Sequence, residues 1–367
     1  MKTEFVCEGK AKLQKSGSVF YNPHMEFCRD ISSLAVGAVG EKISICDSFC
    51  ASGIRGIRYK RENGNAQEVA FVDMNKEACA LARKNAKANR VKGKVHVSDA
   101  RKFFLEHEFD FLELDPFGTP APYLPYAFNS FRAKKIGYVS ATATDVAVLC
   151  GAHSEACLKV YQAHPIDNEF CHENGIRILL GKMAREAAGA ELGIEPLVSF
   201  SHRHYMKIIV RVKKGAKEAV ESVRKLGYIG WCSRCLFRNA IKLPETKICP
   251  ECGNLLEFAG PLWLGELSNR EFVEKMRELN KERKYANEKA VEKMLSLISE
   301  ECGMPPAYYD LHSIVKKLKQ GAVGSEPVME SLRADGYRCA KTHFNPNAIK
   351  TDAPLGAIKE IIRELKI

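Results

Sequence analysis

Short apolar and β-branched runs alternate with helical stretches through the first half of the chain. Between two of these runs, residues 75–89 are rich in Ala, Lys and Leu and predict a helix. Strands that alternate with helices are typical of βαβ units and of a parallel sheet. We therefore expect an α/β, doubly wound (Rossmann-like) first domain over residues 1–213. Its predicted strands are residues 42–47, 68–73, 94–98, 109–115, 135–141 and 205–213.

The pattern changes in residues 214–367, which we expect to form a smaller α+β C-terminal domain. A cysteine cluster occupies 231–258, and apolar positions spaced along one helical face predict a single long helix over 267–300. Residues 304–367 then contain two short helical runs followed by a β-like stretch, an order that resembles a winged helix.

The composition points to a folded protein with an anionic partner. Apolar residues make up 46% of the 367 residues, and 56 Lys and Arg against 45 Asp and Glu give a net charge of +11. Basic side chains that face phosphates give sequence-independent affinity. No apolar stretch approaches the roughly 20 residues of a membrane span, and the start does not resemble a secretion signal. We therefore expect a cytoplasmic protein without a membrane partner.

Four of the fourteen cysteines are clustered. Cys232-x-x-Cys235 and Cys249-x-x-Cys252 are separated by 13 residues, so two knuckles can present four thiolates tetrahedrally. We expect a closed structural Zn²⁺ site, because four protein ligands leave no position for a catalytic water. The other ten cysteines are expected to be mostly buried free thiols, although disulfides stay possible for some pairs.

Acidic residues follow three of the predicted strands. Asp47 ends the first strand and leads into a turn that contains Gly53, which lets backbone approach a ligand closely. Asp73, at the end of the second strand, can bind both hydroxyls of a ribose. Asp99 can accept a hydrogen bond from an adenine amino group while the N–H of Ala100 contacts the ring. Each acid alone could equally be a structural cap, but the three together predict a nucleoside site.

The fourth strand ends in the turn Asp115-Pro116-Phe117-Gly118. An exocyclic amine on a purine is a poor nucleophile, so its methylation needs an acceptor such as the Asp115 carboxylate to orient it and take its proton. Phe117 can hold the base by stacking. The alternative is a buried Asp that caps a turn beside a core Phe.

These motifs resemble the tRNA (guanine-26 N2)-dimethyltransferase family of class I S-adenosylmethionine-dependent methyltransferases. The likeness covers essentially the whole chain. It implies transfer of methyl groups from S-adenosylmethionine to N2 of guanine 26 in tRNA, giving N2-methylguanosine and N2,N2-dimethylguanosine. The segments that carry it are residues 20–23, 29–30, 51–58, 115–119, 142–145, 150–153, 261–265 and 342–344.

The resemblance also implies residue roles. Arg29, Arg55, Asp73, Asp99 and Ala100 would contact S-adenosylmethionine, and Asp115 would be the catalytic acceptor. Phe20 and Phe117 would sandwich the target base. Arg58 lies in the same segment as Arg55, which we favour because it is nearer the turn, and Asp145 is a further candidate for the base pocket. The cysteine quartet is not shared by every member of the family.

Two rival interpretations stay open. The chain could methylate a guanine N2 at another position of tRNA or rRNA, or it could be a nucleic-acid-binding regulator whose zinc cluster and winged helix act without catalysis. We expect the C-terminal domain to bind tRNA, and the sequence implies no obligate protein partner. The expected anchors are Arg234, Arg238, Arg338, Lys341 and Lys350.

Overall fold

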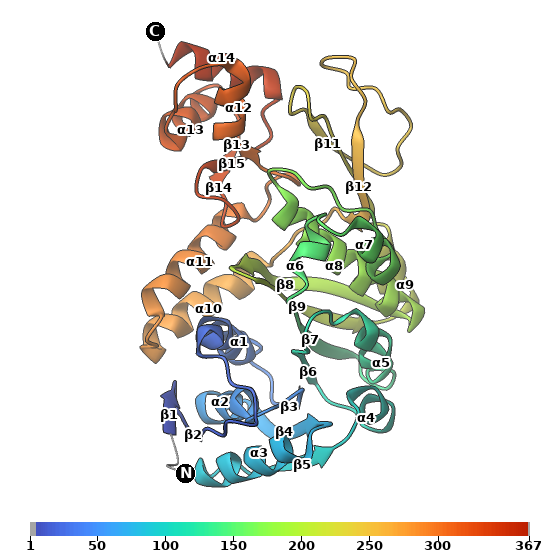
Figure 1. The fold of residues 1–367 in the computed structure, drawn as a ribbon, viewed down its shortest axis with the longest axis vertical. Coiled ribbons are helices and arrows are strands. Elements are labelled where there is room, and N and C mark those ends of the chain that lie inside the picture. The colour runs from blue at the N-terminus through green and yellow to red at the C-terminus, as the bar shows by residue number, and fades with distance from the viewer. Residues whose placement is uncertain (1–4, 366–367) are drawn as a thin grey trace.

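The computed structural model describes residues 5–365, and a seven-stranded sheet lies at the centre of its larger part (Figure 1). The strand order is β5-β4-β3-β6-β7-β9-β8. β3 to β7 pair in parallel, and β9 inserts antiparallel between β7 and β8. The predicted α/β fold with a mostly parallel sheet is therefore confirmed. The strands are β3 (Ile43–Ser48), β4 (Ala66–Asp73), β5 (Gly93–Val97), β6 (Phe111–Leu114), β7 (Ile136–Ala143), β8 (Leu192–His202) and β9 (Tyr205–Lys214).

Helices cover both faces of this sheet and enclose two apolar cores. Ile45 and Cys46 are neighbours in β3 but belong to opposite cores, because successive side chains of a strand point to opposite faces. One core contains side chains of α1 (Glu26–Ala38), α2 (Ile54–Glu62) and α3 (Lys76–Ala88). The other contains side chains of α4 (Ala100–Glu106), α5 (Leu124–Asn129) and α8 (Cys171–Gly189). The shorter elements are β1 (Phe5–Glu8), β2 (Ala11–Gln14), α6 (Val146–Leu149) and α7 (Ser154–Tyr161).

The sequence did not identify β8. This strand contains Pro196, and a proline inside an apolar run argues against a central strand because it cannot donate to the ladder. The structure accommodates it at the sheet edge, where the pairing register with β9 shifts between Pro196 and Val198.

The cysteine cluster lies in the connections between the strands of a three-stranded antiparallel sheet, which follows α9 (Ala216–Val223). Its strands are β10 (Leu226–Trp231), β11 (Arg238–Ile241) and β12 (Glu257–Trp263), in the order β11-β10-β12. We call residues 226–263 the cysteine module. Leu262 and Trp263 of β12 are fully buried in the same core as α8, so the module is anchored on the central sheet unit.

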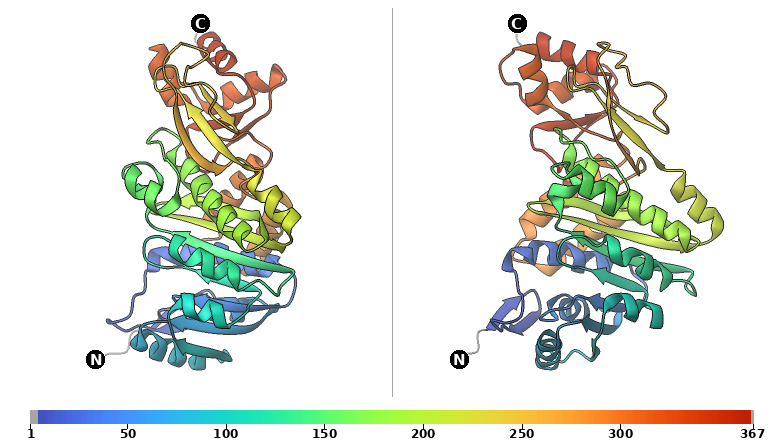
Figure 2. Two further views of the ribbon diagram at one scale, coloured as in Figure 1. Left: turned by 90° about the vertical axis from the view of Figure 1, so that its right-hand side faces the viewer. Right: turned by 45° about the vertical axis from the view of Figure 1, so that its right-hand side comes forward.

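The predicted long helix over 267–300 is wrong, because the chain forms two helices there. α10 (Arg270–Arg283) ends at Lys284, whose φ of 51° is left-handed and breaks the helix, and α11 (Glu288–Glu301) runs back along it. Both helices share the core of α1, beside which they lie in Figures 1 and 2. Tyr285, in the turn between them, donates to Glu62 Oε2 at 2.6 Å.

The last part of the chain forms a separate small core at the end of the molecule opposite the central sheet (Figure 2). We call residues 309–364 the terminal unit. Two of its helices and the strand that follows match the predicted runs. Its three-stranded sheet has the order β13-β15-β14. Among the described residues, no helix is both long and apolar enough to cross a membrane. The elements are β13 (Tyr309–Asp310), α12 (Leu311–Leu318), α13 (Ser325–Ala334), β14 (Cys339–Lys341), β15 (Ala348–Thr351) and α14 (Leu355–Glu364).

Candidate active site

A cavity of about 240 Å³ opens at the carboxyl ends of β3, β4 and β6, the edge at which open α/β sheets bind ligands. It brings together side chains that are more than 90 residues apart in sequence, such as Phe20 and Asp115. Seven of the ten residues predicted for the site line this cavity: Phe20, Arg29, Asp47, Arg55, Asp73, Asp115 and Phe117.

The loop between β3 and α2 has a strained backbone beside the cavity. Phe49 and Ala51 adopt left-handed φ values of 66° and 45°, and Gly53 caps α2 at 81°. Non-glycine residues in this region cost free energy and cluster at ligand sites. The N–H of Ala51 donates to Asp73 Oδ2 at 3.0 Å, so the predicted ribose-binding acid also holds the loop in place.

Asp47 lies beneath this loop. Its carboxylate is almost completely buried and accepts the backbone N–H of Gly56 at 2.9 Å, which ties the end of β3 to α2. Burial raises the pKa of Asp47 to about 7. Asp47 is therefore protonated more readily than an exposed aspartate.

Arg55 holds the Asp115 carboxylate at the floor of the cavity. Its Nε and Nη2 lie 2.8 Å and 2.7 Å from Asp115 Oδ2. Burial alone raises the pKa of Asp115, but the positive charges of Arg55 and Lys207 hold it below its ordinary value. Asp115 is therefore ionised at neutral pH and able to accept a proton.

A buried chain of polar groups lies behind Asp115, and the sequence analysis missed it. Lys207 Nζ, on β9, lies 2.5 Å from Glu113 Oε1 and donates to Thr142 Oγ1 at 3.0 Å. Thr142 also lowers the pKa of the Asp115 carboxyl, in the same direction as Arg55 and Lys207. The signal in the sequence was a charged residue inside each of two otherwise apolar strands, Glu113 and Lys207. Because unpaired charges are almost never fully buried, these two residues could have been expected to pair.

Replacing Thr142 by Val is expected to move the acidic limb of the kcat/KM profile to higher pH. The hydroxyl stabilises the ionised form of Asp115, so its loss raises the pKa of that carboxyl and the carboxylate is protonated earlier as pH falls. Ser140→Ala is the matched control, because the Ser140 hydroxyl is equally buried on β7 but has no hydrogen-bond partner among residues 5–365. An unshifted limb in Thr142→Val, or the same shift in Ser140→Ala, would contradict this role.

Phe20 and Phe117 lie at the mouth of the cavity. They are 56% and 79% exposed, which is unusual for phenylalanine, and their ring centroids are 4.8 Å apart in an edge-to-face contact. A base inserted between the rings would have to separate them. Gly118, at φ 75°, turns the chain after Phe117, and its N–H donates to Thr144 Oγ1 at 2.9 Å.

Gly53, Asp99 and Ala100 do not line the cavity. Asp99 caps α4, and its Oδ2 lies 2.6 Å from Arg101 Nη2. It is nevertheless close to the cavity, because the N–H of Ser98 donates to the carbonyl of Asp73 at 3.0 Å. Ala100 is buried.

The two candidate arginines of α2 have different environments. Arg58 is fully buried and pairs with Glu8, Asp30 and Glu62 at 2.6–2.8 Å, away from the cavity, whereas Arg55 reaches Asp115. Arg29 lines the cavity and also pairs with Glu8, at 2.6 Å. Asp145 does not line it, and both of its oxygens accept from the Tyr161 hydroxyl, at 2.9 Å and 2.8 Å.

Comparison with known proteins decides the family. The family model described as "N2,N2-dimethylguanosine tRNA methyltransferase" matches residues 2–363. This chain belongs to that family. A tRNA (guanine(26)-N(2))-dimethyltransferase of Methanobrevibacter smithii is 42% identical over 364 residues, covering 96% of this chain and 93% of its own. The enzyme of the same description from Thermococcus kodakarensis is 37% identical over 378 residues, covering 97% and 96%.

A solved structure agrees with this assignment. Trm1 from Pyrococcus horikoshii, in complex with S-adenosyl-L-methionine, superimposes with a TM-score of 0.89 at 34% identity and covers 98% of this chain and 99% of its own. The dimethylguanosine methyltransferase resemblance inferred from the motifs is therefore confirmed, and the central sheet has the class I methyltransferase fold.

The four clustered cysteines of this family member fit a metal ion. The sulfurs of Cys232 and Cys252 are 3.5 Å apart, as are those of Cys235 and Cys249, and all four lie within 4.8 Å of one another. Zn–S bonds of about 2.3 Å in a tetrahedron separate sulfurs by about 3.8 Å. The donor set therefore suits a closed zinc site.

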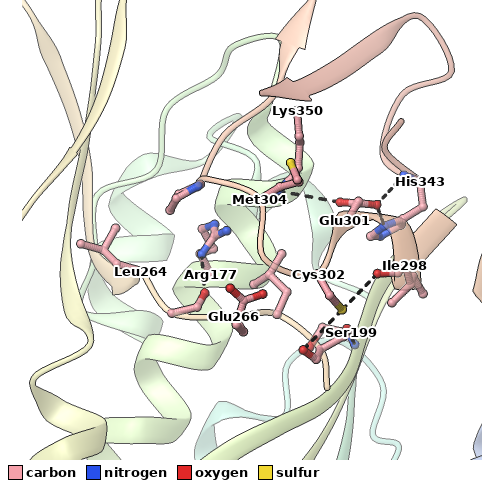
Figure 3. Close-up of a pocket in the computed structure, with 14 residues that line it drawn as sticks. Arg177, Ser199, Leu264, Glu266, Ile298, Glu301, Cys302, Met304, His343 and Lys350 are labelled. Atoms are coloured by element: carbon pink, nitrogen blue, oxygen red, sulfur yellow. Dashed lines mark hydrogen bonds and ion pairs between the residues drawn. The ribbon is translucent and has the colours of Figure 1, made fainter. Parts of the chain in front are cut away.

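A second cavity, of about 110 Å³, lies where α8, α11 and the terminal unit meet (Figure 3). Charged side chains around it pair with one another: Glu301 Oε1 lies 2.6 Å from His343 Nδ1, and Lys350 Nζ lies 2.8 Å from Glu173 Oε1. Because these charged side chains already pair with one another, we interpret this cavity as part of the contact between the central sheet unit and the terminal unit.

The prediction that Arg238 and Lys350 anchor tRNA is wrong, because both side chains are buried and already paired with acidic residues. Lys350 is only 2% exposed, and Arg238 is 7% exposed and pairs with Glu169 at 2.5 Å. Neither can reach a phosphate. Arg234 is exposed, and the side chains of Arg338 and Lys341 are 60% and 45% exposed.

Proposed function

We propose that this chain transfers methyl groups from S-adenosylmethionine to the exocyclic N2 of guanine 26 in tRNA, giving N2-methylguanosine and then N2,N2-dimethylguanosine. One feature of the cavity supports this proposal most directly. Asp115 is held ionised by Arg55 at the floor of a cavity whose mouth carries two exposed aromatic rings. A proton acceptor beneath a stacking platform is what methylation of a flipped purine amine requires.

The cofactor would bind along the ends of β3, β4 and β5. Asp73 would accept the ribose hydroxyls, since each carboxylate oxygen retains acceptor capacity beyond its backbone hydrogen bond. Asp99 and Ala100 would contact the adenine, and Arg29 and the loop from Asp47 to Gly53 would complete the site. When bound, S-adenosylmethionine supplies an already activated methyl group, so the transfer needs no metal.

The protein's task is then to position the amine and remove its proton. Guanine 26 would be extruded from the tRNA core at a cost of a few kcal/mol, which stacking on Phe20 and Phe117 would offset. Asp115 would orient N2 and accept its proton while the methyl carbon leaves the sulfur of S-adenosylmethionine and bonds to N2. Arg55 would hold that carboxylate in position, and the positive charges of Arg55 and Lys207 would keep it ionised.

Replacing Phe117 by Ala is expected to lower kcat/KM for tRNA by about 5- to 150-fold, which corresponds to the roughly 1–3 kcal/mol of one base–aromatic stack. Because the ring is 79% exposed, thermal stability is expected to change little. Single-turnover kinetics and a melting curve test both statements. Phe5→Ala is the matched control, since Phe5 is 52% exposed but lies outside the cavity lining. Equal losses in both variants would contradict the stacking role.

The C-terminal part would grip the tRNA. We propose the division at residues 213 and 214, with a zinc module over 231–258 and a winged-helix unit over 304–367. The strand-helix-helix-strand-strand order of β13, α12, α13, β14 and β15 supports the winged-helix assignment. α10 and α11 belong to the C-terminal part in sequence, but they pack in the same core as α1 of the first domain. The tRNA substrate agrees with the cytoplasmic location expected from the sequence.

Removing Arg234 and Arg338 together is expected to weaken tRNA binding and to flatten its salt dependence. Each lost phosphate contact reduces the slope of log K against log salt by about 1. Both side chains are exposed, although Arg338 also pairs with Asp352 at 2.7 Å. Binding isotherms at several salt concentrations measure the slope. Lys217→Ala on α9 controls for loss of an exposed charge elsewhere, and an unchanged slope in the double variant would refute this surface.

The function is tested by incubating the protein with S-adenosylmethionine and an unmodified tRNA transcript, and then mapping methylated nucleosides by mass spectrometry. Methylation of guanine 26, absent from a transcript with adenine at that position, is the expected result. Methylation at another guanine would favour the rival N2-methyltransferase, and binding without any transfer would favour the regulator.

A further inference from the structure

A second group of metal-binding side chains lies between α6 and α8. Cys150 directly follows α6, and Cys171 and His172 are the first two residues of α8. Their ligand atoms, two sulfurs and a ring nitrogen, all lie within 4.8 Å of one another. Neither the methyl transfer nor the four-cysteine cluster uses these three residues.

We propose that Cys150, Cys171 and His172 bind a second Zn²⁺ ion. Two thiolates and an imidazole are a common zinc donor set. The separation of 3.7 Å between Cys171 Sγ and His172 Nδ1 is close to the edge of about 3.5–3.8 Å expected between ligands of a tetrahedral zinc. It also resembles the 3.5 Å separations within the four-cysteine cluster.

The backbone holds these ligands together before any metal binds. Gly151 has a φ of 104°, and a Cβ at this position would lie 2.7 Å from the backbone nitrogen of Asp167. The turn after Cys150 therefore packs directly against the segment that leads into α8, and no side chain fits between them. This close approach fixes Cys150 opposite Cys171.

The three ligands are half-buried, so an ion can reach them from solvent. They leave one position of a tetrahedral zinc open, for water or for the exposed Asp167 carboxylate nearby. The site differs in this respect from the four-cysteine cluster, which is closed. It is therefore expected to exchange its metal faster.

The position of the ion would link the catalytic cavity to the C-terminal part. Thr144, which lines the cavity, and Asp145 lead directly into α6. On the other side, Glu173 follows the ligands in α8 and pairs with Lys350 of β15 at 2.8 Å. The ion would close the loop over residues 151–170, which also carries Tyr161, the partner of Asp145. The ion would thus connect the segment that contains Thr144, at the cavity, with α8, which contacts β15 through Glu173 and Lys350.

Metal content of the full-length protein tests this proposal. After reloading with ZnCl₂ and removal of excess metal, elemental analysis is expected to give two zinc ions per chain for the wild type and one for Cys171→Ser. His172→Cys preserves a three-ligand set and is expected to keep two. Cys157→Ala, which removes a buried thiol of α7 that is not a member of the ligand group, is the matched control and is also expected to keep two.

A spectroscopic measurement on the unaltered protein covers the case in which Cys171→Ser does not fold. Titration of metal-free wild-type protein with Co²⁺ is expected to give thiolate-to-cobalt charge-transfer absorption that saturates at two equivalents, with two steps. Saturation at one equivalent, or one zinc per chain in both wild type and Cys171→Ser, would overturn the proposal. An intact mass lower by two hydrogens, restored by reduction, would show a Cys150–Cys171 disulfide and would overturn it as well.

Discussion

Replacing Asp115 by Asn is expected to lower methyl transfer to tRNA by about 10²- to 10⁴-fold, the range typical for loss of a general base. The amide cannot take the proton that leaves guanine N2, although it can still hydrogen-bond the amine. Affinity for S-adenosylmethionine is expected to change little, because the proposed ribose and adenine contacts lie at Asp73 and Asp99. Methyl incorporation under saturating substrates and calorimetric titration of the cofactor measure the two effects separately.

The substitution also leaves the buried Arg55 without its anionic partner, so a loss of stability has to be distinguished from a loss of chemistry. Asp110→Asn is a suitable control, because Asp110 also pairs with a cation, Lys134 at 2.5 Å, but does not line the cavity. It is expected to keep near-wild-type transfer. If Asp115→Asn retained more than about a tenth of the wild-type rate while remaining folded, Asp115 would not be the acceptor.

Removing the metal from the four-cysteine cluster, by chelation or by Cys249→Ser, is expected to unfold the cysteine module and to weaken tRNA binding at least tenfold. The buried core around the thiols is small, formed by Cys232, Cys249 and Leu256, and cannot hold the knuckles together alone. Structural zinc contributes on the order of 10 kcal/mol in comparable small modules.

The loss would spread to the terminal unit through specific contacts. Lys317 of α12 donates to the carbonyl of Ser233 at 2.9 Å, and Lys359 of α14 donates to that of Cys235 at 3.1 Å. Binding of S-adenosylmethionine is expected to persist, because the cluster lies far along the chain from the cavity and shares none of its residues. Filter binding of tRNA, cofactor titration and hydrogen exchange of residues 231–258 measure these outcomes.

The control for this prediction is Cys339→Ser, which alters a half-buried thiol outside both metal-ligand groups. It is expected to retain tRNA binding. Unchanged tRNA affinity after complete zinc removal would show that the module does not hold the substrate.

The sequence by itself determined the five parallel strands of the central sheet and most of the residues that line the candidate active-site cavity. Five parallel strands were readable from the sequence. Four of them, β3, β4, β6 and β7, are largely buried, and a strand buried on both faces needs a mostly apolar run, which is a local property of the chain. The acids at the strand ends were readable for a related reason, since parallel strands bring their carboxyl ends to one edge. The spacing of the four cysteines likewise predicted their convergence before any fold was known.

The tertiary structure alone decided which charged residues meet. Lys207 and Glu113 are 94 positions apart, and only the insertion of β9 beside β7 brings them behind Asp115. The burial of Arg238 and Lys350, which removed them from the tRNA surface, depends on partners far away in sequence. The break at Lys284 has the same origin, because the turn there is held by contacts to α1 and α2.

Cys150, Cys171 and His172 show this difference most clearly. Neither their spacing nor their neighbours in sequence mark them as candidate ligands, and they converge where the turn at Gly151 packs against the backbone of Asp167. The periodicity and spacing of residues show whether one segment forms a helix, a strand or a metal knuckle, because these depend on nearby residues. Which side chains of distant segments contact one another depends on the packing of the whole chain, and no single segment contains that information.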